Sequence, residues 1–355
     1  MKWDSDNSGR ATQKAAYGLL SRVALYAEKW DVAAQAARDC ATAEGNLDLS
    51  KNGYAKIFEL GINSPEVLFA VEFKSSVIDH AYDAYVRPSG DTKELGKQVY
   101  SGFVPTSELV DSYEMAGDGG NFSWEKHGKD PYANREPRFY ATILYNGADW
   151  MGRKIESFVG GKDGYKAYEN AGAAGTTVTG YYLRKYLIDG DKTWVTSGSG
   201  QDWIVLRYAE VLLNKAEALA MENWNKNSAE ALQALNDVRA RVGLPARATA
   251  DKETFLEYVR HERKVELAGE GFRYWDLRRW RLAEKVIDGQ NVHGVKISKQ
   301  SDGSFTYEQV DADGGHKRIF YDRYYRFAIP LSERSNNSLC TCLLYTSPSP
   351  RDRQK

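Results

Sequence analysis

Histidines and carboxylates near residue 262 are the side chains of this sequence with the most obvious chemistry. His261 and Glu262 form the dipeptide that opens the zinc-protease motif, which needs a second histidine one helical turn later so that both imidazoles reach one ion. Position 265 is Val265, so the motif is incomplete. The remaining histidines show no metal-ligand spacing either: His80, His127, His293 and His316. We therefore expect no metal site.

Glu262 and Glu266 lie one helical turn apart and invite comparison with the acid and base of a glycosidase. Such enzymes hold two carboxyls about 5–10 Å apart on opposite sides of a sugar, usually on different elements. Here both lie on one helical face beside Arg260 and Arg263, so ion pairing is the better interpretation. The sequence has no GxSxG elbow, and GEGF at 269–272 is not a phosphate loop. We expect a non-enzymatic protein without a cofactor.

Aromatic residues in predicted loops are the feature of this sequence that points to a binding function. Aromatic residues make up 12% of the chain and include 23 tyrosines, more than a helical core needs. The apolar face of a sugar stacks on an aromatic ring, while its hydroxyls bond to short polar side chains. We predict a ligand-binding role for six rings: Trp124, Tyr132, Trp150, Tyr165, Tyr168 and Trp194. The alternative for each ring is a buried loop anchor, and the candidate polar partners are Asn121, Asn134, Asn146 and Asp149.

Charges of both signs crowd together with large rings between residues 260 and 280. Such a mixture indicates a packed ion-pair seam more than a solvated face, because indole and phenol rings favour burial. We predict that Arg263, Glu266, Arg273 and Asp276 form this seam. Arg273 and Asp276 are expected to pair with each other and to set the angle between two helices.

Amphipathic helices must carry these residues. Residues 10–44 are predicted to form a helical hairpin, because apolar residues recur at helical spacing on both sides of a turn at Trp30–Asp31. The stripes expected to face the core are Ala16, Leu19, Leu20, Val23, Ala24 and Ala27, then Ala33, Ala36, Ala37, Cys40 and Ala41. Small residues facing a bulky stripe let two helices approach closely, as in a tetratricopeptide unit.

Residues 207–242 are predicted to form a second helical pair. Ser228 is the expected N-cap of its second helix, and Gly243 is expected to end that helix. A third helix begins near Asp251 and opens a closing region, 251–337. Two pairs are too few for a free-standing solenoid, so they must pack on other parts of the chain.

Residues 45–202 lose helical periodicity and are rich in Gly, Asn, Asp, Ser and Tyr. Three extended runs, at 66–73, 139–145 and 181–187, are predicted to be short strands among long loops. Long irregular connections are usually functional or disordered, so this stretch is the expected ligand region. Residues 281–317 show little pattern.

Composition excludes several classes of protein. Lys and Arg number 48 against 49 Asp and Glu, so the net charge of −1 gives no field to attract nucleic acid. No apolar run approaches the roughly 18 residues of a membrane span. Three cysteines, Cys40, Cys340 and Cys342, do not form a disulfide framework.

Three segments of the chain carry a family resemblance: RYAEVLLNKAEA (207–218), ALNDVRARVGLP (234–245) and ERKVELAGEGFRYWDLRRW (262–280). At these residues the chain resembles the SusD/RagB family of outer-membrane nutrient-binding lipoproteins, and the resemblance covers most of residues 10–337. It implies a mainly α fold: a SusD-like α/α superhelix with tetratricopeptide-type hairpins and a loop-rich region with a few short strands. It also implies a closing strand-like motif at 318–330.

The resemblance implies a function as well. It implies a surface-exposed, lipid-anchored protein of the outer membrane that binds glycan and delivers it to a SusC-type TonB-dependent transporter. A peptide ligand is an alternative within the same family. A tetratricopeptide scaffold that binds a partner protein along 16–41 and 208–242 is a second interpretation, and a hydrolase is a third.

Both ends of the chain depart from the family pattern. MKWDSDNSGR has neither the apolar stretch nor the cleavage site of a secretory signal. The resemblance suggests that the chain begins inside the fold, without the signal and the lipidated cysteine, so that 1–337 is a partial SusD/RagB-like domain. Residues 338–355 read as non-genomic sequence or a disordered tail, and we expect no role for them.

Overall fold

The computed structural model describes residues 9–50, 52–168, 176–327 and 329–337. The chain divides into two compact units. The first contains Met1–Arg273 and Val292–Gly314, and the second contains Tyr274–Asn291 and Gly315–Lys355. The predicted ligand region, 45–202, therefore belongs entirely to the first unit.

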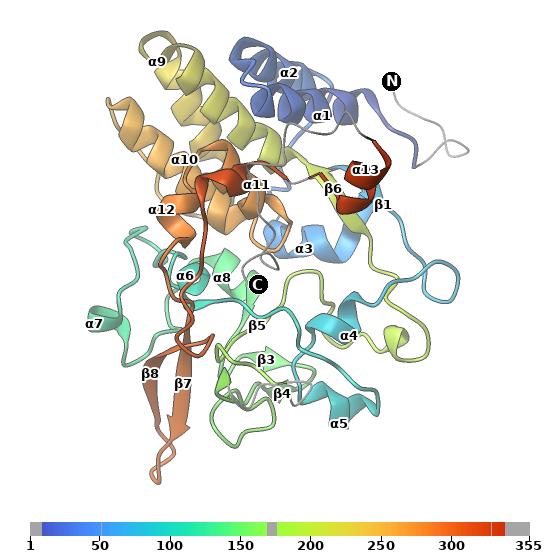
Figure 1. Cartoon of the computed structure of the whole chain (residues 1–355), viewed down its shortest axis with the longest axis vertical. Coiled ribbons are helices and arrows are strands. Elements are labelled where there is room, and N and C mark those ends of the chain that lie inside the picture. The colour runs from blue at the N-terminus through green and yellow to red at the C-terminus, as the bar shows by residue number, and fades with distance from the viewer. Residues whose placement is uncertain (1–8, 51, 169–175, 328, 338–355) are drawn as a thin grey trace. The chain divides into compact units, whose positions relative to one another are not determined.

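Four helices form the helical layer of the first unit: α1 (Gln13–Tyr26), α2 (Trp30–Thr42), α9 (Tyr208–Arg241) and α10 (Lys252–Glu266). They lie side by side in Figure 1, where α2 packs against both α1 and α9, and α10 packs against α9. Alanine and leucine dominate their buried contacts. Small side chains let these helix axes approach closely, which buries a continuous core.

The buried face of α1 is not the stripe predicted from its sequence. Leu19, Leu20 and Val23 are 50%, 44% and 56% exposed, and of the six predicted core residues only Ala24 is buried. The buried positions are Ala15, Gly18, Ser21, Ala24 and Leu25. The prediction was wrong because the small-residue face allows the closest approach: a Cβ on Gly18 would lie 2.8 Å from Leu206. On α2 the predicted stripe is buried except for Ala41.

A sharp break divides α9 at Asn223, whose φ and ψ are −165° and 95°. The Asn223 side chain accepts a hydrogen bond of 3.2 Å from the backbone N–H of Lys226, so Asn223 caps the second half of the helix. The expected N-cap at Ser228 was therefore wrong. The helix ends at Arg241, and Gly243 follows with a φ of +75°, as predicted for a helix stop.

Short elements joined by long loops make up most of the remaining first unit. They are α3 (Gly53–Leu60), η2 (Gly61–Asn63), β1 (Val67–Val71), α4 (Tyr82–Val86), α5 (Asp91–Leu95), α6 (Ser107–Val110), α7 (Trp124–His127), α8 (Pro137–Thr142), β2 (Ile143–Leu144), β3 (Asp149–Trp150), β4 (Arg153–Lys154), β5 (Tyr182–Leu183), η4 (Thr193–Val195) and β6 (Trp203–Arg207). β1 pairs antiparallel with β6, β2 with β5, and β3 with β4. Each predicted extended run contains one of these strands, although α8 occupies 137–142.

A regular hairpin, β7 (His293–Lys299) and β8 (Phe305–Asp311), completes the first unit within a stretch that showed little pattern in the sequence. Val295 and Ile297 are buried on the inner face of β7 in the same cluster as Tyr132 and Phe139. The turn contains Gly303 at a φ of +86°, a conformation that glycine adopts without strain. Period-two alternation over so few residues is a weak signal, and the prediction missed it.

The second unit contains the residues of α11 (Phe272–Arg279) from Tyr274 onward, α12 (Ala283–Ile287), η5 (Asp322–Tyr325) and α13 (Leu331–Asn336). Its core is built from Leu277, Ala283 and Phe320. The expected strand-like motif at 318–330 was wrong, because the described part of this run forms a turn at η5. Its rings instead gather around Arg278, whose guanidinium carbon lies 4.7 Å from the ring centre of Phe327.

The mainly α fold class predicted from the sequence is confirmed. None of the helices in the part of the chain that the structure describes has the length and apolar character needed to span a bilayer. Residues 338–355, with Cys340 and Cys342, lie outside the described residues.

We predict that Gly18→Leu lowers the free energy of unfolding by about 1–3 kcal/mol, because the new side chain must displace Leu206 and Leu68 in a packed core. Ala16→Leu is the matched control, since it adds the same side chain to the exposed face of the same helix. It should change that free energy by no more than about 0.5 kcal/mol. Urea denaturation of both variants measures the difference, and equal stability would mean that α1 buries its leucine face.

Candidate functional site

A buried network of ion pairs, here called the charged core, joins the helical layer to the loop region of the first unit. It contains six carboxylates, on Glu66, Glu114, Glu136, Glu262, Glu266 and Glu270, and six cationic groups, on Arg138, Lys185, Arg207, Arg239, Arg241 and Arg247. All of these side chains are buried except that of Arg247, which is 28% exposed. Equal numbers of opposite charges keep this interior electrically neutral.

Glu266 on α10 is the carboxylate with the most arginine partners in the charged core. It accepts hydrogen bonds from Arg207 at 2.6 Å, from Arg138 at 2.9 Å and from Arg241. Burial alone would raise the pKa of Glu266, but the charges of these three arginines outweigh it and hold that pKa well below its ordinary value. The carboxylate therefore stays ionised and is not available to transfer a proton.

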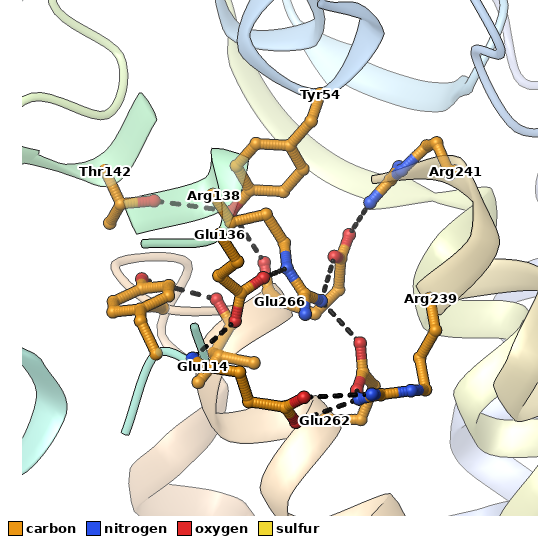
Figure 2. Close-up of polar contacts among 12 residues, drawn as sticks. Tyr54, Glu114, Glu136, Arg138, Thr142, Arg239, Arg241, Glu262 and Glu266 are labelled. Atoms are coloured by element: carbon orange, nitrogen blue, oxygen red, sulfur yellow. Dashed lines mark hydrogen bonds and ion pairs between the residues drawn. The ribbon is translucent and has the colours of Figure 1, made fainter. Parts of the chain in front are cut away.

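Glu262, one turn before Glu266 on the same helix, is engaged in the same way (Figure 2). Arg138 donates to Glu262 at 2.5 Å and to Glu136 at 2.6 Å, so its guanidinium lies among three carboxylates. Arg239 donates to Glu262 at 3.0 Å and holds Glu114 through two bonds of 2.9 Å. Both carboxylates of the imagined glycosidase pair are thus buried and bonded to arginine, which supports the structural interpretation of Glu262 and Glu266.

The other side of the charged core centres on Glu270. Arg207 donates two hydrogen bonds of 2.7 Å to this carboxylate, and the Lys185 ammonium donates one of 2.7 Å. Lys185 also donates to the carbonyls of Glu266 and Ala268. Its burial lowers the pKa of Lys185 to about 8, although the nearby Glu270 charge opposes that change. Every donor of this ammonium is used within the protein.

The residues predicted to form the ion-pair seam have different surroundings. Glu266 lies in the charged core, whereas Arg263 donates to the Asn214 amide at 2.7 Å. Asp276 accepts a bond of 2.9 Å from Arg279. Arg273 belongs to the first unit and Asp276 to the second, so their expected pair stays a prediction.

Two of the six predicted ligand rings, Trp150 and Trp194, are 0% and 1% exposed. The Arg87 guanidinium lies between them, 5.2 Å from the Trp150 ring centre and 5.1 Å from that of Trp194. The Trp150 indole N–H donates to Asp91 at 3.0 Å. These contacts are those of loop anchors, the alternative weighed for each ring.

The other four predicted rings are spread over the ligand region. Tyr165 is 9% exposed, and Tyr168 is 47% exposed. Trp124 is half-buried and donates to Asp111 at 2.9 Å, and its ring centre lies 6.2 Å from that of Tyr307. Tyr132 is buried beside Tyr307. The ligand-binding role of the six rings stays a prediction, and the structure does not bring them together as one set.

A different set of rings surrounds a cavity of about 320 Å³, here called the aromatic hollow. Its walls are Tyr132, Tyr140, Tyr145, Phe305 and Tyr307, with Asp130, Ala133, Asn146 and Gly147. The Tyr132 ring centre lies 4.6 Å from that of Tyr145 and 5.7 Å from that of Tyr307. The cavity is at the small end of the range of about 300–1,000 Å³ found for ligand sites.

Polar groups at the aromatic hollow are few and well defined. Tyr140 donates to the carbonyl of Tyr132 at 2.8 Å, which fixes its ring. Within the described part of the chain, the side chains of Asn146 and Asp130 make no hydrogen bond. Burial raises the pKa of Tyr145 to about 12, so its phenol is protonated at neutral pH. The hollow therefore combines flat apolar walls with hydrogen-bonding groups that remain available.

Sequence reasoning found two residues of the aromatic hollow, Tyr132 and Asn146, and missed the other rings. Phe305 and Tyr307 are two positions apart on β8 and so share one face, a signal that reading this hairpin would have revealed. Tyr140 and Tyr145 lie in a run that was interpreted only as a strand. Among the residues that the structure describes, no group of three or more His, Cys, Asp or Glu side chains could hold a metal ion.

The fold and the aromatic hollow together define a helical scaffold that carries a ligand-sized cavity. A family model described as the SusD family matches residues 65–341 of this sequence. Because the match covers well over half of the chain, the protein belongs to the SusD family.

Individual relatives agree with this assignment. The chain is 24% identical over 335 residues to a SusD-like protein of Bacteroides ovatus, and this alignment covers 88% of this chain and 55% of that protein. It is also 32% identical over 133 residues to a SusD-like protein of Formosa agariphila, and this alignment covers 35% of this chain and 25% of that protein.

Solved structures give the same result. A SusD-like protein of Bacteroides fragilis superposes with a TM-score of 0.77 at 26% identity, covering 95% of this chain and 66% of that chain. A SusD-like carbohydrate-binding protein of the same species gives a TM-score of 0.76 at 26% identity, covering 94% and 66%. This chain thus spans less than two thirds of the length of each of these four relatives.

We predict that Glu266→Gln lowers the free energy of unfolding by about 3–5 kcal/mol, because it removes the charge that compensates three buried arginines. Glu230→Gln is the matched control. Glu230 pairs with Arg38 at 2.7 Å on the surface, where both side chains are more than a third exposed. That change should cost no more than about 1 kcal/mol. Equal losses in urea denaturation would show that the charged core is not what holds the first unit together.

We predict that stability falls steeply in acid. The pKa values of Glu114, Glu266 and Glu270 are held below their ordinary value by neighbouring cations. Above about pH 4.3 these groups are ionised in both states, so their full contribution is present. Below about pH 4.3 these carboxylates bind protons in the unfolded chain before they do so in the folded protein. Their contribution to the free energy of unfolding is therefore lost as the pH falls toward the lower pKa values of the folded state.

Urea midpoints measured near pH 7, 5 and 3 should therefore be level between the first two and much lower at the third. The Glu266→Gln variant should show a shallower decrease. A wild-type midpoint that is unchanged near pH 3 would contradict this account of the charged core.

Proposed function

We propose that this protein binds an oligosaccharide at the aromatic hollow without cleaving it and delivers it to a SusC-type TonB-dependent transporter at the outer membrane. The hollow is the observation that carries the proposal. Five rings surround a cavity that also offers the Asn146 amide and the Asp130 carboxylate. A sugar has both an apolar face, which stacks on rings, and a rim of hydroxyls, which needs such hydrogen-bonding groups.

The composition of the hollow supports binding rather than hydrolysis. A glycosidase needs two carboxyls on opposite sides of the scissile bond. Among the residues that line the hollow, Asp130 is the only one with a carboxylate. The two carboxylates considered from the sequence as a glycosidase pair, Glu262 and Glu266, are buried and bonded to arginine.

Membership of the SusD family supports the proposed cargo, location and partner. One similar structure is described as a SusD-like carbohydrate-binding protein. We propose that the complete protein is lipid-anchored at the cell surface, as the resemblance implies. A transporter partner would then receive the ligand that the hollow holds.

We predict that Tyr307→Ala weakens glycan binding by roughly tenfold, a loss of about 1.4 kcal/mol, because it removes one wall of the hollow. Affinity electrophoresis of the full chain through gels that contain laminarin, xylan, galactomannan, alginate or carrageenan identifies the retained polymer. Isothermal titration with its oligosaccharides then gives the affinity. Thin-layer chromatography of the same mixtures should show no product.

Tyr100→Ala is the matched control, because this tyrosine is 47% exposed and stacks on Tyr85 at 5.1 Å, away from the residues that line the hollow. It should leave binding unchanged. Retention of the Tyr307→Ala variant equal to wild type would place the ligand elsewhere. Binding of peptides and of no glycan would support the peptide alternative.

A further inference from the structure

A second and larger cavity in the first unit, of about 640 Å³, adjoins the aromatic hollow and has a different chemistry. We call it the basic cavity, because its walls include Lys56, Arg135, Arg184, Lys185 and Arg241. Glu59 is the only carboxylate among its lining residues. Tyr54, Tyr140 and Tyr186 supply rings.

Two of these five cations are neutralised inside the protein. Arg241 pairs with Glu66 at 2.6 Å and with Glu266, and Lys185 pairs with Glu270 at 2.7 Å. Both belong to the charged core, where positive and negative groups are equal in number. They contribute little net potential to the cavity, so its charge depends on the remaining three.

Arg135 is a buried cation that has no bonded carboxylate among the residues that the structure describes. Its guanidinium donates to the carbonyls of Pro131 at 3.0 Å, Val110 at 2.6 Å and Tyr113 at 2.9 Å. It is only 2% exposed and lies 4.1 Å from the ring centre of Phe122. Burial lowers the pKa of Arg135, with the charge of Asp111 opposing this, yet an arginine remains ionised near neutral pH. Arg135 therefore supplies positive potential from within the cavity wall.

Arg184 and Lys56 supply cations that a ligand can reach. The side chain of Arg184 is 33% exposed and forms a long ion pair of 3.9 Å with Asp189, whose side chain is 41% exposed. Lys56 is exposed on α3, and its ammonium makes no ion pair within the described part of the chain. Glu59 and Asp189 offset at most two of the three charges on Lys56, Arg135 and Arg184. The cavity therefore keeps a net positive charge.

Tyr140 lines both cavities, so a site with aromatic walls lies next to a site with positive charge. We propose that the ligand is an acidic oligosaccharide: one sugar stacks in the aromatic hollow while a carboxylate or sulfate group of a neighbouring sugar binds Arg184 and Lys56 in the basic cavity. This inference rests on the proposed function and specifies its substrate class. Ion pairs at such an exposed site weaken as salt increases, whereas stacking does not.

The test compares polymers that differ in charge. Affinity electrophoresis of the full chain uses alginate and polygalacturonate as carboxylate arms, carrageenan as the sulfate arm, and laminarin, xylan and galactomannan as neutral arms. We expect retention by at least one acidic polymer. Oligosaccharides of that polymer should bind at least tenfold more tightly than neutral ones, and raising the salt from about 50 to about 500 mM should remove most of this preference.

The double variant Lys56→Gln/Arg184→Gln should lose about tenfold or more in affinity for the acidic oligosaccharide. The double variant Lys29→Gln/Lys226→Gln removes the same net charge from exposed positions that line neither cavity, and it should bind like wild type. The carboxylate and sulfate arms show which acidic group is recognised.

Retention by neutral polymers alone, or an acidic ligand whose affinity the Lys56→Gln/Arg184→Gln change leaves intact, would overturn the inference. If Tyr307→Ala still abolished that neutral retention, the proposed function would stand while the substrate class would be wrong. Absence of binding to every polymer, acidic and neutral, would overturn both.

Discussion

The first unit depends on one shared interaction, in which the Glu266 carboxylate is held by arginines from three different elements. Arg138 comes from α8, Arg207 from β6 and Arg241 from α9. Moving such charges out of water costs several kcal/mol each, so any one pair alone would stabilise the fold little. Together they form a geometry in which each charge is compensated only when all four elements are in place. The benefit is a defined arrangement of helices and loops.

That arrangement lets long loops hold rings in fixed positions. Buried arginines also hold the loop region together, through cation–π contacts. Arg87 contacts the buried indoles of Trp150 and Trp194, and Arg135 contacts the ring of Phe122. Trp150 and Trp194 are buried against Arg87, whereas Tyr132, Tyr140, Tyr145, Phe305 and Tyr307 line the aromatic hollow. Pre-organised rings lose little conformational entropy when a ligand binds.

Local patterns in the sequence were sufficient to predict the mainly α class and helices such as α2 and α10. The apolar periodicity of α2 and the start of α10 at its N-cap Asp251 can both be read without knowledge of distant contacts. Local patterns failed where a contact with a residue distant in sequence determines which side chains are buried. Gly18 faces the core because Leu68 and Leu206 lie against it, and no local rule prefers that face over Leu19 and Leu20. Likewise ring type and loop context cannot show that Trp150 is buried, since its burial depends on contacts with Arg87 and Asp91.

Charge balance distinguishes the charged core from the cations at its edge. Inside it, six carboxylates meet six cations, and the field that reaches the surface from this interior is small. Arg135 and Arg184 lie outside that balance, one bonded to carbonyls and the other 3.9 Å from its nearest carboxylate. Their charge is only partly offset, by Asp189 for Arg184 and by Asp111 for Arg135, and it acts on the basic cavity that shares Tyr140 with the aromatic hollow. A chain of net charge −1 can therefore carry a local excess of positive charge, because its interior is neutral and the arginines at the margin of the charged core are only partly paired.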